Sequence, residues 1–184
     1  MSDDKKAVSL AKGYLAESYE DIDPILDRHG VDLVDETRES FIVKVQKLMK
    51  ACKNDTNRVD FDDMIWFPNV HGLKLDAYDM VYIDEAQDLN IAQINLAINS
   101  CGKNGRIISV GDEHQAIYGF RGADSNAIQN IVNRCESKRL PLSVTYRCAT
   151  SIVDLAKTLV PNLEAAPNAE QGLVESIGEN SMEK

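Results

Sequence analysis

The sequence predicts an α/β fold built on a parallel sheet, with a mostly helical segment at its amino terminus. Three short apolar runs, at residues 80–83, 107–110 and 142–144, have the length and composition of buried strands. Each is followed by a segment whose apolar residues recur at steps of three and four, the pattern of an amphipathic helix. Strands that alternate with helices in this way are joined by right-handed crossovers, which makes them parallel.

The amino-terminal third contains helical patterns only. One helix is predicted over residues 5–19 and a second around residues 41–52. Asp35 is the N-cap candidate for the second helix, because its short carboxylate can accept from free backbone N–H groups of the first turn. A polar connection through Pro24 and Gly30 is expected to separate the two helices.

Beyond Val59 the hydrophobic period changes, and strands alternate with helices. The run at residues 80–83 is wholly apolar, so a strand buried on both faces of the sheet is expected there, and likewise at residues 107–110. In chain order the predicted elements are a strand at 80–83, a helix from Ile91 that closes near Gly102, a strand at 107–110, a helix over 127–135, a strand at 142–144, a helix stopped by Pro161, and a strand at 173–177.

Composition excludes several classes of protein. The 184 residues are 43% hydrophobic and 27% charged, which is ordinary for a globular protein. No apolar run approaches the roughly 20 residues that a membrane span requires. The first residues are polar and lead into no apolar signal region, so we expect a soluble, cytoplasmic protein without a membrane partner. The cysteines and histidines are too scattered for a zinc site, and free thiols are expected.

The first candidate site residues, Asp84 and Glu85, follow the strand at residues 80–83. The carboxyl ends of parallel strands are where such sheets bind their ligands. In phosphoryl transfer one acid at this position holds Mg²⁺ and a neighbour orients or deprotonates the attacking water, so Asp84 is assigned to the metal and Glu85 to the base. Taken alone, the two acids are also compatible with a strand that simply enters solvent.

The segment after the next strand adds further candidates. Gln115 can donate to a terminal phosphate oxygen and accept from water, so it could sense the γ-phosphate of a nucleotide near Asp84 and Glu85. Tyr118 and Phe120 could stack on unpaired bases, at about 1–3 kcal/mol each, or pack in the core.

Three more side chains complete the candidate set. Arg121 can meet a phosphate or pair with an acid. Tyr146 and Arg147 follow the strand at residues 142–144, where the tyrosine could stack on adenine and the arginine could reach a nucleotide as an arginine finger.

Taken together, these segments resemble a known family. The ordered set D-E-A-Q-D, G-D-E-H-Q-A-I-Y-G-F-R-G-A and T-Y-R is similar to motifs II, III and IV of UvrD/Rep-type superfamily 1 DNA helicases. Residues 60–65 also resemble the element that precedes motif II in that family, and the likeness covers roughly residues 59–160. Phe120 stands where a tryptophan is common, a change that keeps an aromatic stacking face.

The resemblance implies a P-loop NTPase fold of the RecA-like type and an ATP-dependent DNA helicase that uses ATP and Mg²⁺ on single-stranded DNA or a single-strand/duplex junction. Its site roles would be Mg²⁺ binding by Asp84, general base by Glu85, γ-phosphate contact by Gln115, DNA contact by Tyr118, Phe120 and Arg121, adenine stacking by Tyr146, and arginine finger by Arg147. The net charge of −10 offers no basic face for DNA, so stacking would carry part of the binding.

The family pattern is incomplete in these 184 residues. No G-x-x-x-x-G-K-[ST] phosphate loop occurs, and motifs V and VI are not found. We therefore expect an incomplete core: residues 1–58 as a helical, insert-like segment of the first motor domain, 59–139 as the carboxyl-terminal half of that domain, and 140–184 as the start of the second. The chain would then be a helicase fragment, with the phosphate loop supplied by a partner chain. The alternatives are a non-catalytic helicase-like binding module and a different P-loop-like ATPase or nuclease-associated partner.

Overall fold

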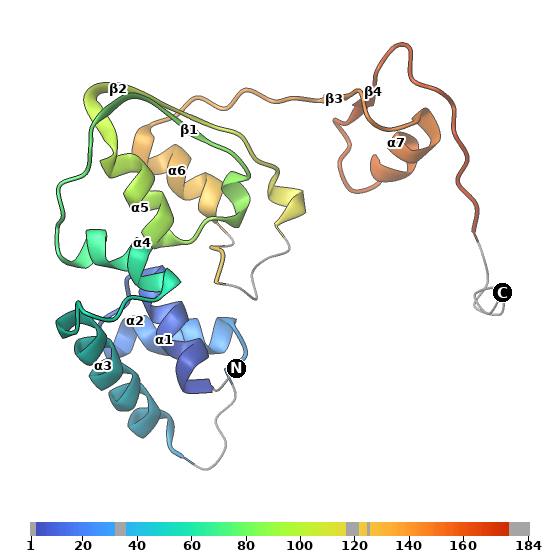
Figure 1. Ribbon diagram of the computed structural model, residues 1–184. Helices are drawn as coiled ribbons and strands as arrows, with labels where there is room; N and C mark the ends of the chain where they lie inside the picture. The colour runs from blue at the N-terminus through green and yellow to red at the C-terminus, as the bar shows by residue number, and fades with distance from the viewer. Residues whose placement is uncertain (1–2, 32–35, 117–121, 125, 177–184) are drawn as a thin grey trace. The chain divides into compact units, whose positions relative to one another are not determined.

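A computed structural model of the chain describes residues 3–31, 36–116, 122–124 and 126–176 (Figure 1). The chain forms two compact units, Met1–Ser137 and Lys138–Lys184, and each is described by itself. In chain order the elements of the first unit are α1 (Asp3–Tyr14), α2 (Tyr19–Arg28), α3 (Arg38–Asn54), α4 (Phe61–Val70), β1 (Tyr78–Ile83), the 3₁₀ turn η1 (Ala86–Asp88), α5 (Ile91–Asn99), β2 (Cys101–Ser109), the 3₁₀ turn η2 (Glu113–Gln115) and α6 (Ala127–Cys135).

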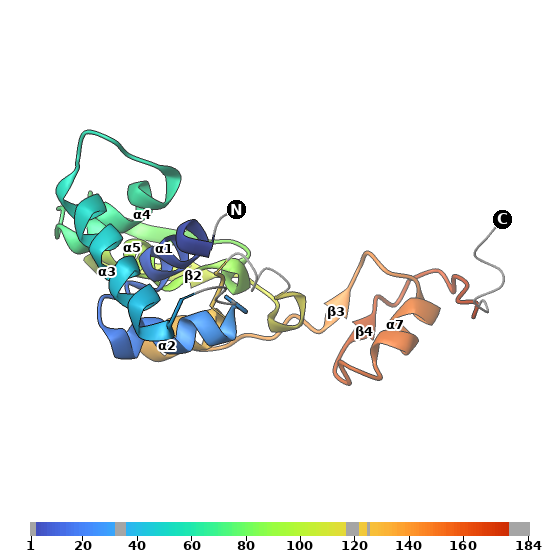
Figure 2. The same cartoon turned by 90° about the horizontal axis from the view of Figure 1, so that it is seen from below.

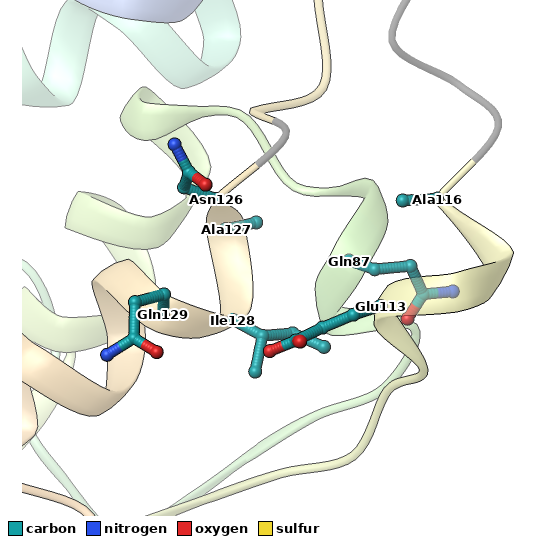
Figure 3. Close-up of a pocket in the computed structure, with 7 residues that line it drawn as sticks. All are labelled: Gln87, Glu113, Ala116, Asn126, Ala127, Ile128 and Gln129. Atoms are coloured by element: carbon teal, nitrogen blue, oxygen red, sulfur yellow. The ribbon is translucent and has the colours of Figure 1, made fainter. Parts of the chain in front are cut away.

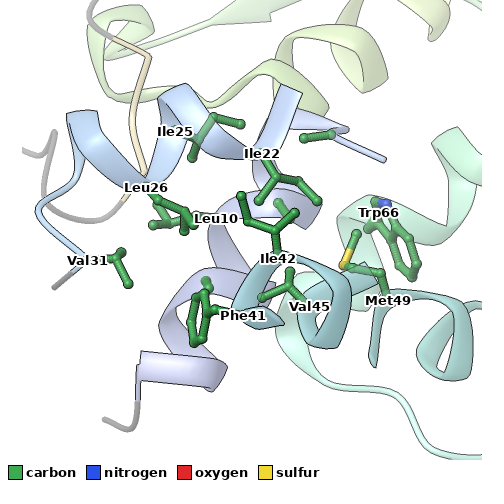
Figure 4. Close-up of a cluster of buried hydrophobic side chains, with 13 residues drawn as sticks. Leu10, Ile22, Ile25, Leu26, Val31, Phe41, Ile42, Val45, Met49 and Trp66 are labelled. Carbon is green, nitrogen blue, oxygen red and sulfur yellow. The ribbon is translucent and has the colours of Figure 1, made fainter. Parts of the chain in front are cut away.

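Helices α1 to α4 enclose the larger hydrophobic core (Figure 4). Phe41, Ile42 and Val45 on one face of α3 meet Ile22 and Leu26 of α2, and Trp66 of α4 closes the cluster. Figure 2 shows the same group of helices from below. Burial of these side chains is what holds helices of 10 to 17 residues together, since isolated helices of that length are marginal in water.

Two of these helices were not predicted from the sequence. Pro24 lies inside α2 and Pro68 inside α4, and proline is normally taken as a sign that a helix stops. Both helices instead begin with a capping box, Ser18 with Asp21 and Asp60 with Asp63. The helix expected over residues 5–19 consequently ends at Tyr14.

The cap expected for α3 was also wrong. The side chain that accepts from the first turn of this helix belongs to Thr37, which bonds the backbone N–H of Ser40. Asp35 itself lies outside the described residues. Threonine can satisfy the free N–H groups of a first turn much as aspartate does, and it was not considered at this position from the sequence.

Strands β1 and β2 form a two-stranded parallel sheet, in which Met80 pairs with Arg106 and Tyr82 with Ile108. Helices α5 and α6 cover one face of it through a second core, composed of Ile83, Ala86, Ile94, Ala127 and Ile131. The helix predicted over residues 127–135 is confirmed as α6. The α5 prediction is confirmed except for its end, because Gly102 lies inside β2 and the helix is capped by Ser100.

The expectation that both strands are buried on both faces was wrong. Tyr82 is 71% exposed, and Ile108 and Val110 are also exposed. Successive side chains of a strand point to opposite faces, and helices among the described residues pack on only one face of this sheet. The apolar runs therefore indicated strands correctly but overestimated how much of each strand is covered.

The second unit contains β3 (Val144–Thr145), α7 (Thr150–Ala156) and β4 (Glu164–Ala165). The predicted third strand is shorter than expected, and it pairs in parallel with β4 in a separate small sheet. The predicted helix is α7, which ends before Pro161. Residues 173–176 form no strand, contrary to expectation. Within the described part of the chain, no helix is long and apolar enough to cross a membrane.

Candidate functional site

The carboxyl ends of β1 and β2 are joined by backbone hydrogen bonds. Val110 N–H donates to Ile83 O at 2.8 Å, and Ala86 N–H donates to Val110 O at 2.9 Å. The turn at residues 84–89 and the segment at residues 111–116 therefore start side by side. The polar side chains of the hydrogen-bonded path described next all belong to these two segments.

Glu85 has an unusual backbone conformation. Its φ of 49° and ψ of 46° lie in the left-handed region, which costs a residue with a Cβ roughly 1–2 kcal/mol. Its N–H donates to Oδ1 of the preceding Asp84 at 3.0 Å. Both acids are exposed, and strained residues of this kind concentrate at functional sites.

Gln87 links the two segments from below the surface. Its side chain is only 4% exposed, and its Nε2 donates to Oε2 of Glu85 at 2.7 Å. Its Oε1 accepts from the backbone N–H of Asp112 at 3.0 Å. One amide thus fixes both the carboxylate of the candidate base and the start of the second segment. Sequence reasoning missed this residue, although a glutamine between two acids directly after a strand was a usable signal.

The hydrogen-bonded path continues to Gln115. Oδ2 of Asp112 accepts from Nε2 of Gln115 at 2.7 Å, while Oδ1 accepts from the N–H of His114 at 3.0 Å and caps η2. Glu85, Gln87, Asp112 and Gln115 therefore form one continuous series of side-chain and backbone contacts. Asp112 is the second residue that sequence reasoning did not single out.

Gly111 makes this approach sterically possible. A Cβ at this position would lie 2.6 Å from Oε1 of Gln87 and 3.0 Å from the backbone nitrogen of Ala86. Distances this short are not tolerated, so any side chain here would push the amide away from Asp112. The glycine of the sequence motif is thus explained by packing against Gln87 and not by its backbone angles.

A pocket of about 220 Å³ adjoins the path (Figure 3). Its lining comes from η1, the η2 segment and the start of α6, and consists of Gln87, Glu113, Ala116, Asn126, Ala127, Ile128 and Gln129. Three of these side chains carry amides, and three others (Ala116, Ala127 and Ile128) are apolar, so the lining is mixed.

The donor atoms at this edge fit a magnesium ion. Asp84, Glu85 and Asp112 provide carboxylate oxygens, which Mg²⁺ prefers, and Asp84 and Glu85 are open to solvent. Among the residues that the structure describes, no three metal-binding side chains gather at one point.

The structure does not test the positions of the remaining predicted site residues relative to this site. Tyr118, Phe120 and Arg121 lie outside the described residues. Tyr146 and Arg147 belong to the second unit. There Tyr146 is 82% exposed, and the N–H of Arg147 donates to Oγ1 of Thr145 at 3.3 Å.

The residues that directly follow segment 117–121 are firmly anchored. Ala123 and Asp124 are buried. The N–H of Asp124 donates to Leu89 O at 3.1 Å, and its carboxylate accepts from the N–H of Asn126 at 3.1 Å and from the side chain of Asn130. Asp112 and Asp124 are thus both hydrogen-bonded to the turn at residues 84–89, the first to Gln87 and the second to Leu89.

Known proteins share this part of the chain. DNA helicase II of Haemophilus influenzae is 33% identical over 85 residues, which cover 46% of this chain and 12% of that protein. F-box DNA helicase protein 1 of Schizosaccharomyces pombe is 36% identical over 94 residues, covering 51% of this chain and 10% of that protein. The ATP-dependent DNA helicase PcrA of Leuconostoc citreum is 26% identical over 147 residues, covering 75% of this chain and 20% of that protein.

The chain spans a fifth or less of the length of these three relatives. The family model that matches is the UvrD/REP helicase N-terminal domain, over residues 14–136, which is more than half of the chain. The match includes both segments of the site, the end of α1 and helices α2 to α6. The chain belongs to the UvrD/Rep family of DNA helicases.

Proposed function

We propose that the chain is part of an ATP-dependent DNA helicase that couples hydrolysis of Mg-ATP to translocation on single-stranded DNA and to duplex unwinding. The observation that carries this proposal is the hydrogen-bonded path from Glu85 through Gln87 and Asp112 to Gln115. It joins a carboxylate suited to activate water with an amide suited to sense a phosphate. The same path leads directly into the segment assigned to DNA.

On the nucleotide side, Glu85 takes the proton of the attacking water. Gln87 holds Oε2 of its carboxylate, which fixes the orientation of the group while Oε1 stays available to water. Gln115 contacts the γ-phosphate with its amide, and Asp84 holds Mg²⁺. The ion, when bound, neutralises charge that develops on the phosphate oxygens.

The second unit supplies the other nucleotide contacts in this proposal. Tyr146 stacks on adenine, for which its exposed ring is suited. Arg147 acts as an arginine finger, which requires a guanidinium free to approach a phosphate from a neighbouring domain. By the same proposal residues 59–139 are the carboxyl-terminal half of a first motor domain and residues 140–184 the start of a second.

On the DNA side, Tyr118 and Phe120 stack on bases and Arg121 meets the strand. Loss or gain of a γ-phosphate changes the hydrogen bonds available to Gln115, and Asp112 passes that change to Gln87 and to the beginning of the DNA segment. In this proposal the phosphate loop is supplied by another polypeptide segment or by a partner chain. A non-catalytic helicase-like binding module is the competing function, and it would use the same fold without turnover.

The test is steady-state ATP hydrolysis by the purified chain, with and without single-stranded DNA. Glu85→Gln should abolish any DNA-stimulated turnover. Glu136→Gln is the matched control, because Glu136 has nearly the same left-handed backbone, with φ of 48°, and ends α6 away from the site. Turnover unaffected by Glu85→Gln would refute the assignment of the base.

Two other outcomes separate the alternatives. A folded chain that hydrolyses ATP only after a polypeptide with the G-x-x-x-x-G-K-[ST] loop is added would support a divided active site. A folded chain that binds DNA but shows no turnover in either condition would favour the binding module.

A further inference from the structure

A second pocket, of about 370 Å³, lies beside the carboxyl-terminal half of helix α3 in the first unit. Its lining includes Gln46, Met49, Lys50 and Lys53 of α3, Trp66 of α4, and Glu17, which precedes α2. Pockets that hold small organic molecules have volumes of about 300–1,000 Å³, so this one is large enough for a small ligand. It shares no lining residue with the pocket beside Gln87, and a ligand here would not occupy the candidate nucleotide site.

Trp66 gives this pocket a buried hydrogen-bond donor that is not used. The residue is only 1% exposed, and among the described residues its Nε1 has no hydrogen-bond partner. Buried indole N–H groups usually have an acceptor, and a buried donor without one is unfavourable. Met49, which is also buried, lies beside the indole ring in the same core (Figure 4). The two side chains therefore combine an apolar surface with one unsatisfied N–H group.

The charged side chains of the pocket favour an anion. Nζ of Lys53 donates to Oε1 of Glu17 at 3.0 Å, which neutralises that carboxylate. Nε2 of Gln46 donates to the backbone oxygen of Glu17 at 3.0 Å and fixes the same edge. Lys50 is exposed, and its ammonium pairs with no carboxylate in the part of the chain that the structure describes. Two lysines and one glutamate give the lining a formal charge of +1, although the chain as a whole carries −10.

A complementary ligand needs an apolar body for Met49 and Trp66, an oxygen acceptor for Nε1, and a negative charge for Lys50. A carboxylate provides the acceptor and the charge in one group, because it is ionised at neutral pH and only accepts hydrogen bonds. The flexible stem of Lys50 lets its ammonium approach that group. We propose that this pocket binds a small aliphatic or aromatic carboxylic acid, with one carboxylate oxygen accepting from Nε1 of Trp66. This binding is independent of the proposed function, since it involves neither nucleotide nor DNA.

The first experiment observes the indole group while phenylbutyrate is added to the whole chain. Trp66 is the one tryptophan, so the ¹H–¹⁵N spectrum contains a single indole Nε1–H signal. A new hydrogen bond to a carboxylate oxygen should move the proton of this signal downfield, and the shift should saturate. A molecule of this size is expected to bind with a dissociation constant on the order of 1 mM.

Two analogues of phenylbutyrate separate the acceptor from the charge. Phenylbutyramide keeps an acceptor oxygen but is neutral, so it should move the indole signal in the same direction and bind about 2- to 5-fold more weakly, the range of an exposed ion pair. Phenylbutylamine lacks the acceptor and carries the opposite charge, so the downfield shift should be absent. Equal affinities and equal shifts for all three compounds would reduce the site to apolar contact and overturn the proposal.

Variants of Lys50 test the charge from the side of the protein. Lys50→Gln should weaken phenylbutyrate binding by about 2- to 5-fold and leave the affinity for phenylbutyramide unchanged, whereas Lys50→Arg should retain both. Lys47→Gln is the matched control, because Lys47 is exposed on the same helix but does not line the pocket. An indole signal that does not move at about 10 mM phenylbutyrate, ten times the expected dissociation constant, would overturn the proposal. So would equal losses of affinity in Lys50→Gln and Lys47→Gln.

Discussion

Gln87 and Gly111 should contribute to stability as a coupled pair, and a double-mutant cycle tests this. Gln87→Ala removes the bond to the charged Glu85 and leaves the N–H of Asp112 without its acceptor. A typical intramolecular hydrogen bond contributes about 1 kcal/mol, and a bond to a charged group about 1.5–3 kcal/mol. Because Glu85 is exposed, water can replace part of the hydrogen bonding that its carboxylate loses. We therefore expect the free energy of unfolding to fall by about 2–3 kcal/mol.

Gly111→Ala alone should cost about 1–3 kcal/mol, since the new methyl group overlaps Oε1 of Gln87 at 2.6 Å. In the Gln87→Ala background that oxygen is gone, and the nearest remaining atom is the backbone nitrogen of Ala86 at 3.0 Å. The second substitution should then cost clearly less than it does in wild type. We expect an interaction energy of about 1–2 kcal/mol between the two positions.

The assay is equilibrium unfolding in urea, followed by circular dichroism and by the fluorescence of Trp66. Trp66 is the one tryptophan of the chain; it is buried, and it belongs to the first unit, as do Gln87 and Gly111. Coincident transitions would justify a two-state treatment. Gly105→Ala is the matched control: its Cβ would meet Tyr78 O at 2.7 Å, far from Gln87, and its cost should be equal in both backgrounds. Additivity of Gln87→Ala and Gly111→Ala within about 0.5 kcal/mol would refute the steric account of Gly111.

Three further predictions concern the rest of the first unit. The side chain of Lys12 is 2% exposed and forms ion pairs with Asp60 at 3.2 Å and with Asp63 at 2.7 Å. Lys12→Met should therefore lower the free energy of unfolding, measured in urea titrations, by about 3–5 kcal/mol. A loss below about 1 kcal/mol would contradict a buried ion pair. Burial alone would raise the pKa of Asp60, but the Asp63 N–H and the Lys12 ammonium hold it below its ordinary value. The stability that the Asp60 carboxylate contributes is therefore present above pH ~4 and is lost as the pH falls through the lowered pKa. The free energy of unfolding, measured as a function of pH, should fall in acid in wild type and should fall less in Lys12→Met. Glu136→Gly should raise the melting temperature and add about 0.5–1 kcal/mol, because glycine adopts the left-handed conformation at the end of α6 without strain; an unchanged or lower melting temperature would contradict that.

The sequence predicted the part of the fold that follows from local periodicity. Helix α6 was predicted with its observed bounds because its apolar residues recur regularly and no proline interrupts them. Helix α2 was missed because Pro24 was interpreted as part of a connection, and helix α4 was not predicted although a capping box begins it. The strands were located, but their exposure was not, since it depends on which helices pack against each face.

In the candidate site, too, the sequence predicted the features that depend on local pattern and missed those that depend on tertiary contacts. Asp84 and Glu85 were placed at the end of a strand from the sequence, because the apolar run that precedes them is short and complete. Gln87 could not be assigned a role in this way. Its function depends on Asp112, 25 residues later, and on the absence of a side chain at Gly111, and both become visible only when β1 and β2 are paired.

The exposed apolar side chains of the β1–β2 sheet affect how the described part of the chain behaves in solution. Tyr82 and Ile108 are register partners on adjacent strands and both are exposed, so this apolar surface favours association between two copies of the chain. The formal charge of −10 opposes their approach. Added salt shortens the range of this repulsion to about 8 Å near physiological ionic strength, while apolar attraction persists. Colloidal stability should therefore be greatest in dilute buffer, and light scattering should rise with salt concentration.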